Sequence, residues 1–214
     1  MTATVTVIDY GMGNLFSVSR AFEHCGAEVV VADAPERIAA AERLVLPGVG
    51  AFADGMAELA SRHLVEPILD FCRRGRPFLG ICLGMQMMME YSEEFGVHKG
   101  LGLIAGGVLP IPTKGTDGRP HKIPHIGWNA LFMPRGRSDW GRTPLQHVAP
   151  ESSVYFVHSF AAAPKDPAHL LAQCSYDGVP ITGAIGNGMM FGCQFHPEKS
   201  ARTGLQVIRD FLAL

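Results

Sequence analysis

Apolar and polar residues alternate along the first hundred positions in blocks that predict a regular succession of strands and helices. Amphipathic stretches at 15–25 and 64–74 have helical periodicity, and each is followed by a glycine, Gly26 or Gly75, that can end a helix. Strands that alternate with helices form a parallel sheet. The pattern therefore predicts an α/β fold with a mostly parallel central sheet flanked by helices. The apolar runs with strand length are 5–8, 28–32, 43–46 and 78–81.

The pattern changes in the C-terminal half, where short β-rich runs alternate with turns rich in proline and glycine. This texture predicts an antiparallel β extension of the sheet. Segment 134–142 is expected to be an exposed loop, and 202–214 a closing helix. We expect residues 1–214 to form a single domain. The β-rich runs are 108–111, 126–131, 154–157, 170–175 and 189–195.

Composition narrows the class of protein. The chain has 214 residues, of which 47% are hydrophobic and 18% charged, so a disordered chain is excluded. Lysine and arginine number 18 against 20 acidic residues, and this balance indicates neither a nucleic-acid nor an anionic-membrane partner. We find no charged leader and no apolar run of membrane-spanning length. A cytoplasmic protein with no membrane contact is therefore expected.

Residues 78–86 read Phe-Leu-Gly-Ile-Cys-Leu-Gly-Met-Gln and contain the first candidate for catalysis. Gly80-x-Cys82-x-Gly84 is the thiol counterpart of the Gly-x-Ser-x-Gly nucleophile elbow. Glycine at both flanks would allow the tight strand-to-helix turn, and the following helix would direct its N-terminus at the sulfur. The alternative is a buried cysteine between two packing glycines.

A candidate base follows the strand-like run near the C-terminus, in Gln-Phe-His-Pro-Glu at 194–198. In extended backbone, residues two apart project to the same side. Glu198 would then bond one nitrogen of His196 and leave the other nitrogen for a thiol. A surface loop that contains these residues by chance is the alternative.

A glycine-flanked turn forms the third candidate, in Pro47-Gly-Val49-Gly50. The turn would expose backbone N–H groups, and the N–H of Val49 together with that of Leu83 could form an oxyanion hole. The alternative is an ordinary turn after a core strand.

The remaining cysteines and histidines do not suggest a metal, disulfide or cofactor. Cys25, Cys72, Cys174 and Cys193 form no Cys-x-x-Cys pair and are expected to be core thiols. His121 and His125 are four apart, but Pro120 and Pro124 make a shared helical face improbable. His158 is expected to have a structural or pocket-wall role. A dinucleotide-binding loop at 9–16 is rejected because Phe16 stands where its third glycine is needed.

The three candidate segments, taken in this order and at these distances, resemble the class I (triad) glutamine amidotransferases over nearly the whole chain. The resemblance implies that Cys82 is the nucleophile, His196 the base and acid, and Glu198 the residue that orients it. Val49 and Leu83 would supply the oxyanion N–H groups. Phe160 stands where a tyrosine is expected, so no phenolic hydroxyl is available there. The implied glutamine contacts are Gly50, Gln86, Glu94, Ser159 and Phe160.

Three further segments, 9–15, 124–129 and 155–159, are similar to those of one subgroup, the glutaminase subunits of imidazole glycerol phosphate synthases. This resemblance implies hydrolysis of glutamine to glutamate and ammonia. It also implies a separate (β/α)₈-barrel cyclase subunit, which uses the ammonia to make imidazole glycerol phosphate and an aminoimidazole carboxamide ribotide (AICAR) in histidine biosynthesis. The implied partner contacts are Asn14, Trp128, Tyr155 and Lys199.

Three alternatives remain at this point. One is another triad glutaminase subunit, such as that of pyridoxal phosphate synthase, which the Ile-Gly-Trp-Asn segment at 126–129 disfavours. Another is a catalytically silent module on the same fold, which the presence of all three triad residues disfavours. The third is a cysteine protease, which assays on glutamine and on peptides would distinguish.

Overall fold

The computed structural model, which describes residues 2–214, is built on a seven-stranded sheet in the order β11-β12-β13-β4-β3-β1-β2. The pairs that join β13, β4, β3, β1 and β2 are parallel, whereas β11–β12 and β12–β13 are antiparallel. The prediction of a mostly parallel sheet with an antiparallel extension is confirmed. The strands are β1 Thr4–Ile8, β2 Glu28–Ala32, β3 Leu44–Leu46, β4 Phe78–Ile81, β11 Leu170–Tyr176, β12 Val179–Asn187 and β13 Met190–Cys193.

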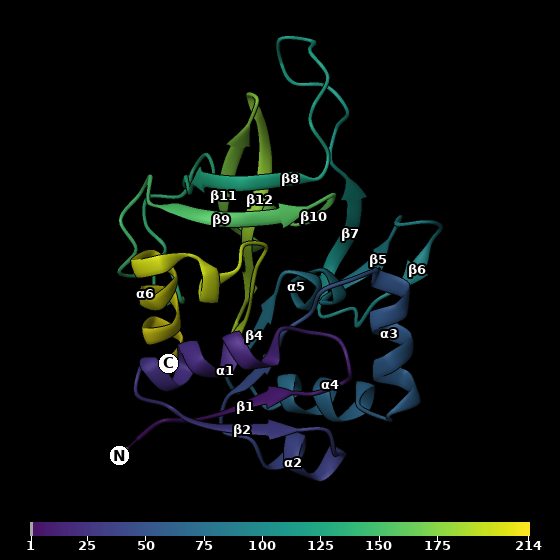
Figure 1. The fold of residues 1–214 in the computed structure, drawn as a ribbon, viewed down its shortest axis with the longest axis vertical. Helices are drawn as coiled ribbons and strands as arrows, with labels where there is room; N and C mark the ends of the chain where they lie inside the picture. Colours follow the sequence, from purple (N-terminus) through teal and green to yellow (C-terminus); the bar gives the residue numbers. More distant parts are fainter. Residues whose placement is uncertain (1) are drawn as a thin grey trace.

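Helices cover both faces of this sheet, with α1 and α6 together on one side and α3 and α4 on the other (Figure 1). Val5 and Val7 face the α1–α6 layer, where Phe22 and Phe211 meet edge to face with ring centroids 6.1 Å apart. On the α3–α4 side, Phe52 is buried in a second hydrophobic cluster. The helices are α1 Leu15–His24, α2 Pro35–Ala40, α3 Phe52–Ser61, α4 Val65–Arg73, α5 Leu83–Met87 and α6 Ala201–Leu212.

Two smaller sheets complete the C-terminal half. One has the order β10-β7-β5-β6, and the other pairs β8 with β9. Figure 1 shows β8 and β9 crossing the upper part of the molecule in front of β11 and β12, with the segment between β7 and β8 projecting beyond them. The bounds are β5 Met89–Ser92, β6 His98–Lys99, β7 Ile104–Pro110, β8 His125–Ala130, β9 Ser153–His158 and β10 Phe160–Pro164, with 3₁₀ turns η1 Pro167–His169 and η2 Pro197–Lys199.

The structure corrects the sequence interpretation at several elements. The helices α2 and α3 were not predicted, and neither were the strands β5, β6, β10 and β12. The run predicted as a strand over 189–195 ends at Cys193, and the chain then enters η2. The closing helix is confirmed, and so is the absence of regular secondary structure over 134–142. The expectation that this loop is exposed is wrong at Trp140, which is buried and donates from Nε1 to the Leu171 carbonyl. None of the helices described within residues 2–214 is long and apolar enough to cross a membrane.

Candidate active site

Cys82 lies in the sharp turn between β4 and α5, with φ 53° and ψ −108°, a conformation that non-glycine residues rarely adopt. A Cβ atom on Gly84 would lie 1.8 Å from the carbonyl oxygen of Leu46, and one on Gly80 would lie 2.7 Å from that of Gly84. Side chains at either flank would therefore clash with backbone. The strained turn that the glycine pattern predicted is confirmed.

The Cys82 sulfur is buried among polar groups. Gln194 donates from Nε2 to Sγ across 3.6 Å, and the Val157 carbonyl oxygen lies 4.0 Å from the same sulfur. The backbone N–H of Cys82 donates to the carbonyl of Cys193 at 2.8 Å, which anchors the turn to β13. Helix α5 has only five residues, so its contribution comes from the free N–H groups of its first turn.

His196 and Glu198 form a buried pair where β13 leads into η2. Nδ1 of His196 lies 2.8 Å from Oε1 of Glu198, and the two side chains are 3% and 1% exposed. The expectation that extended backbone brings them together is wrong, because Glu198 lies in a 3₁₀ turn. The predicted contact itself is present. Since the carboxylate accepts from Nδ1–H, the neutral imidazole presents Nε2 as an acceptor.

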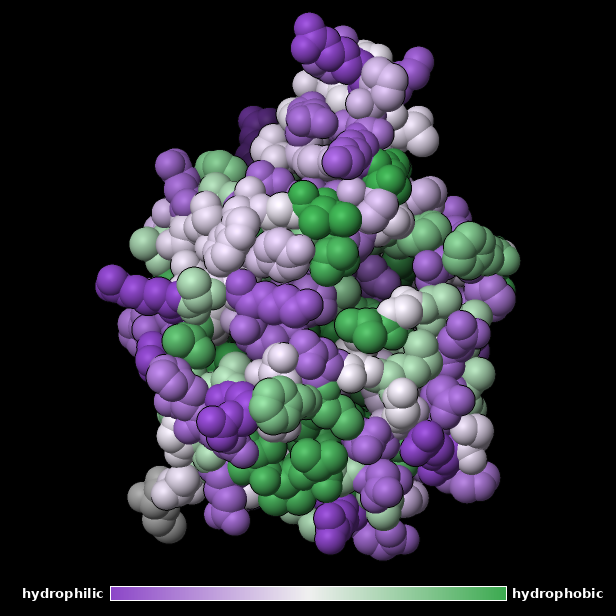
Figure 2. Space-filling view, viewed as in Figure 1, coloured by the Kyte–Doolittle hydropathy of each residue, from purple (hydrophilic) through white to green (hydrophobic). Residues whose placement is uncertain are grey.

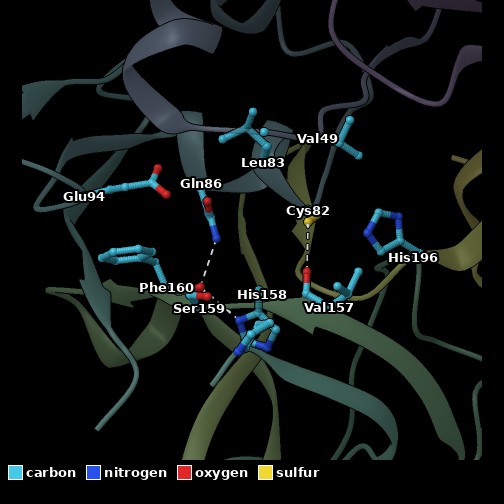
Figure 3. Close-up of a pocket in the computed structure, with 12 residues that line it drawn as sticks. Val49, Cys82, Leu83, Gln86, Glu94, Val157, His158, Ser159, Phe160 and His196 are labelled. Atoms are coloured by element: carbon cyan, nitrogen blue, oxygen red, sulfur yellow. Dashed lines mark hydrogen bonds between the residues drawn. The ribbon is translucent and has the colours of Figure 1, made fainter. Parts of the chain in front are cut away.

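The Nε2 atom of His196 has no hydrogen-bond partner among residues 2–214, and Figure 3 shows this edge of the ring turned toward the Cys82 sulfur. Burial alone would lower the pKa of His196. Interactions with the Cys82 thiolate and with Glu198 outweigh burial and raise that pKa to about 9. The site therefore favours the imidazolium form of His196.

A cavity of about 350 Å³ opens beside the sulfur. It collects residues from the 47–50 turn, the elbow, the segment after β5, and the β9–β10 connection (Figure 3). Every predicted catalytic, oxyanion or glutamine-contacting residue lines the cavity except Glu198, which contacts His196 instead. The lining residues are Val49, Gly50, Cys82, Leu83, Gln86, Glu94, Pro124, Val157, His158, Ser159, Phe160 and His196.

The predicted oxyanion turn packs directly on the elbow. A Cβ atom on Gly48 would lie 2.5 Å from the Tyr10 hydroxyl and 2.9 Å from Cβ of Leu83, so only glycine allows this approach. Gly50 has φ +108°, a value that favours glycine. Leu83 is the first residue of α5, and its N–H therefore has no acceptor within the helix.

Three predicted glutamine contacts already have protein partners. Gln86 donates from Nε2 to the Phe160 carbonyl at 2.9 Å and to Gln194 Oε1 at 3.1 Å. Glu94 accepts on Oε2 from the N–H of Phe52 at 2.6 Å, which ties it to the start of α3. The Phe160 carbonyl also accepts from His158 at 2.9 Å. The Gln86 carbonyl and the second oxygen of Glu94 remain for other partners.

Sequence reasoning missed Gln194, Val157 and Pro124 in this site. Gln194 is fully buried and reaches both the sulfur and Gln86. A polar residue inside an otherwise apolar strand-like run, two positions before His196, was the signal that could have identified it. The expectation for His158 is confirmed, because it forms part of the cavity wall.

The residues expected to meet a partner lie beside the site. Trp128 on β8 and Tyr155 on β9 are opposite each other in register, with rings edge to face and centroids 6.0 Å apart. The carbonyl of Tyr155 accepts from the N–H of His196. Lys199 is exposed on η2, and Asn14 caps α1 by accepting from the N–H of Ser17 at 3.3 Å.

The other thiols are not placed for catalysis. Cys72, Cys174 and Cys193 are buried and Cys25 is half-buried, as expected for core cysteines. Within residues 2–214, no cluster of three or more histidine, cysteine or acidic side chains could hold a metal ion.

Comparison with known proteins identifies the family. The model of the glutamine amidotransferase class-I family matches residues 6–214. A Legionella pneumophila (strain Lens) protein named imidazole glycerol phosphate synthase subunit HisH 1 is 54% identical, with 99% of this chain and 100% of the relative covered. Proteins named imidazole glycerol phosphate synthase subunit HisH from Thermosynechococcus vestitus and Geobacter sulfurreducens are 47% and 46% identical, over 98% and 97% of this chain and 96% and 97% of theirs.

Solved structures agree on the fold. The structure of PurLQS from Thermotoga maritima has a TM-score of 0.73 at 20% identity, with 100% of this chain and 99% of that chain covered. A crystal structure of a glutamine amidotransferase has a TM-score of 0.72 at 14% identity, with 98% and 99% covered. The chain belongs to the class-I glutamine amidotransferases and, among them, to the HisH family of imidazole glycerol phosphate synthase subunits.

Proposed function

We propose that this chain, acting as one glutamine amidotransferase domain over residues 1–214, is the glutaminase subunit of an imidazole glycerol phosphate synthase. It hydrolyses glutamine to glutamate and ammonia with Cys82, His196 and Glu198. The observation that carries this proposal is the pairing at the cavity floor, where an unpartnered imidazole nitrogen faces a sulfur held in an elbow. Sequence relatives with 54% identity support the same activity.

The reaction follows from these positions. The Cys82 thiolate attacks the side-chain amide carbonyl of glutamine, and the C–O double bond becomes an oxyanion. His196, protonated at Nε2, gives its proton to the departing nitrogen, so that ammonia leaves and a thioester remains. His196 then takes a proton from water, whose oxygen attacks the thioester and releases glutamate. Glu198 holds the imidazole and stabilises its charged form.

The oxyanion would lie between the backbone N–H groups of Val49 and Leu83. Both residues line the cavity next to Cys82. The close packing of Gly48 against Leu83 holds the two backbone segments side by side. One such donor contributes about 3 kcal/mol to transition-state stabilisation in comparable sites.

We assign glutamine recognition to the cavity wall that faces the oxyanion N–H groups of Val49 and Leu83. Glu94 offers its second carboxylate oxygen to the α-ammonium group of the substrate, since its first oxygen is used by Phe52. Gln86 offers its carbonyl, because both N–H bonds of its amide are taken. Gly50, Ser159 and Phe160 complete the wall, with backbone groups as their contribution.

The partner that we assign is a (β/α)₈-barrel cyclase, which receives ammonia and forms imidazole glycerol phosphate and AICAR in histidine biosynthesis. Ile126 and Trp128, two apart on β8, are 55% and 52% exposed. Figure 2 shows mainly weakly polar residues over β8 and β9, with a few hydrophobic ones among them. Exposed apolar groups on one strand face favour a protein partner. A partner over the site would keep ammonia neutral and out of bulk water. Asn14, Tyr155 and Lys199 border the same region.

The test is glutamate release by the chain together with a barrel cyclase subunit of histidine biosynthesis. We expect glutamine hydrolysis that Cys82→Ser abolishes, coupled to imidazole glycerol phosphate formation, and no cleavage of peptides. Peptide hydrolysis without glutaminase activity would instead identify a cysteine protease. Glutaminase activity that supports a different acceptor subunit would indicate another triad synthase.

A further inference from the structure

Two buried histidines beside the cavity take no part in the proposed chemistry. His125 on β8 is 1% exposed and His158 on β9 is 6% exposed. Nδ1 of His125 lies 3.0 Å from Nε2 of His158. At the far end, Asn129 Nδ2 lies 2.7 Å from Nε2 of His125, and at the near end, His158 Nδ1 lies 2.9 Å from the Phe160 carbonyl oxygen. The four groups form one continuous line of hydrogen bonds.

The donor and the acceptor of each hydrogen bond in this line follow from the Phe160 carbonyl oxygen at its near end. A carbonyl oxygen can only accept, so Nδ1 of His158 donates to Phe160. In neutral His158, Nε2 must then accept from Nδ1–H of His125, whose own Nε2 accepts from the Asn129 amide. In their neutral forms, both histidines therefore hold their protons on Nδ1. Burial supports this state, since it lowers the pKa of each to about 4.

The Phe160 carbonyl is available to side chains because of its place in β10. The carbonyl of Ser159 accepts from the N–H of Ile111, directly beside the first pair of the β7–β10 ladder. Successive carbonyls of a strand point to opposite sides, so that of Phe160 points away from β7. It accepts there from His158 and from Gln86, each at 2.9 Å (Figure 3).

The line of bonds continues through Gln86 toward the nucleophile. The Gln86 amide nitrogen donates to the Phe160 carbonyl and to Gln194 Oε1. These two hydrogen bonds use both N–H groups, and the two acceptors identify which end of the amide is the nitrogen. The Gln86 carbonyl is therefore left for a ligand. Without a well-placed Phe160 carbonyl, the amide of Gln86 would lose one of its two anchors and could turn.

We propose that His158, oriented by His125, is a positioning residue for glutamine recognition, because it fixes the Phe160 carbonyl that holds Gln86 with its own carbonyl toward the substrate. This proposal rests on the proposed glutaminase function. A positioning role requires a hydrogen-bond donor at the Nδ1 position of His158 but does not require the imidazole ring. A purely structural role in the core would instead depend on the ring itself.

Aromatic stacking holds the ring of His125 in place. The ring of His125 lies between those of Tyr176 and Phe156, with centroids 4.1 and 5.1 Å away. This stack leaves the ring little freedom to rotate, so that Nδ1 stays directed at His158. His121 belongs to the same cluster, 4.8 Å from Tyr176 by ring centroids. Its Nδ1, however, contacts the carbonyl of Pro112, outside the line of bonds.

Two substitutions separate the nitrogen positions. His158→Asn carries its amide nitrogen where Nδ1 was and keeps the bond to Phe160, whereas His158→Gln carries it where Nε2 was and loses that bond. We expect His158→Gln to raise KM for glutamine about tenfold, the size of effect of one buried hydrogen bond, with little change in kcat. His158→Asn should remain within about threefold of the unmodified complex. His121→Gln is the matched control and should leave KM unchanged.

Labelling of Cys82 provides a second measurement. A diazoketone analogue of glutamine needs the recognition wall, whereas a simple haloacetamide needs only an accessible thiolate. We expect His158→Gln to slow the analogue about tenfold and to leave the haloacetamide rate unchanged. If His158→Gln does not fold, His125→Asn and His125→Gln provide the same test. We expect the Gln variant again to raise KM more than the Asn variant, with smaller effects than at His158.

Equal KM values for the Asn and Gln variants, or a loss confined to kcat, would overturn the positioning role while the unmodified complex still hydrolysed glutamine. An unmodified complex without glutaminase activity would overturn the proposed function and this inference with it.

Discussion

Gln194 donates a hydrogen bond to the sulfur of Cys82 across 3.6 Å, although the two residues are 112 positions apart in the chain. The bond exists because β13 pairs in parallel with β4 and the two strands end side by side. Gln194 also accepts from Gln86 at 3.1 Å. A single buried amide therefore connects the nucleophile with the wall assigned to substrate recognition.

Replacement of Gln194 by leucine should impair glutamine hydrolysis. Gln194→Leu removes the donor to Cys82 and leaves one N–H of Gln86 without an acceptor, so we expect kcat/KM to fall about tenfold or more. Steady-state glutamate release by the complex with the barrel subunit measures this. Gln206→Leu is the control, because that side chain donates to Asp210 within α6. Equal activity of the two variants would show that the amide does not support the site.

Loss of the thiol should separate ammonia production from ammonia use. We expect Cys82→Ala to abolish glutamine-dependent synthesis of imidazole glycerol phosphate by the complex. Synthesis from added ammonium salts should remain within about threefold of the unmodified complex, because the acceptor reaction belongs to the partner. Cys72→Ala, a buried thiol on α4, serves as control. Failure of ammonium to restore synthesis would contradict this division of labour.

Cys82 should be the only cysteine that a glutamine-like electrophile labels. Burial raises the pKa of Cys72 and Cys174 to about 12 and that of Cys193 well above its usual value, so these thiols stay protonated near neutral pH. Mass spectrometry of the digested protein after brief exposure to the diazoketone analogue identifies the modified residue. Modification of Cys72 or Cys193 at the same rate as Cys82 would refute the assignment of the nucleophile.

Local patterns predicted the elbow and the strands around it because their causes are local. Gly80 and Gly84 are required by backbone atoms within a few residues or on an adjacent strand, and an apolar run of four is enough to indicate β4. Helix α3 was missed because Ala51 offers no capping side chain. Its N–H group at Phe52 is capped by Glu94, which comes from far along the chain.

His196 and Glu198 show how a correct contact can be predicted from an incorrect backbone conformation. His196 and Glu198 were expected to meet in extended backbone, yet Pro197–Lys199 forms a 3₁₀ turn and the contact still forms at 2.8 Å. Gln194 and the line through His125 depend on strand pairing across more than 30 positions. No local pattern encodes such pairing, which only the folded sheet brings about.

The pH profile of the reaction should have an alkaline limb set by His196. Its pKa is raised to about 9 by Cys82 and Glu198 against the opposing effect of burial. Above that pH the imidazole of the free enzyme loses the proton that the departing ammonia needs, so kcat/KM should fall as pH rises through about 9. Glu198→Gln removes the carboxylate and should move this limb to lower pH and reduce kcat about a hundredfold or more. An unshifted limb would show that Glu198 does not act on His196.

The stability of the fold should decrease on mild acidification because of the two buried histidines. Burial lowers the pKa of His125 and of His158 from 6.5 to about 4, with Asp177 opposing the shift at His125 and the neighbouring histidines adding to both. As pH falls below 6.5, the unfolded chain binds protons first, which favours unfolding. This part of the stability is therefore fully present above about pH 6.5 and is lost as pH falls toward about 4.

His196 acts in the opposite direction, since its pKa is raised from 6.5 to about 9. Its contribution is fully present below about pH 6.5 and is lost as pH rises from there toward about 9. Urea unfolding at a series of pH values between about 6 and 5, where His196 is protonated in both the folded and the unfolded state, measures the effect of the buried pair without that of His196. His158→Asn removes one of the two titrating groups and should make the acid-side loss of stability shallower. His24→Asn, at an exposed position on α1, should leave it unchanged. If the two variants lost stability as steeply as the unmodified chain, the acid sensitivity would have to arise from other groups.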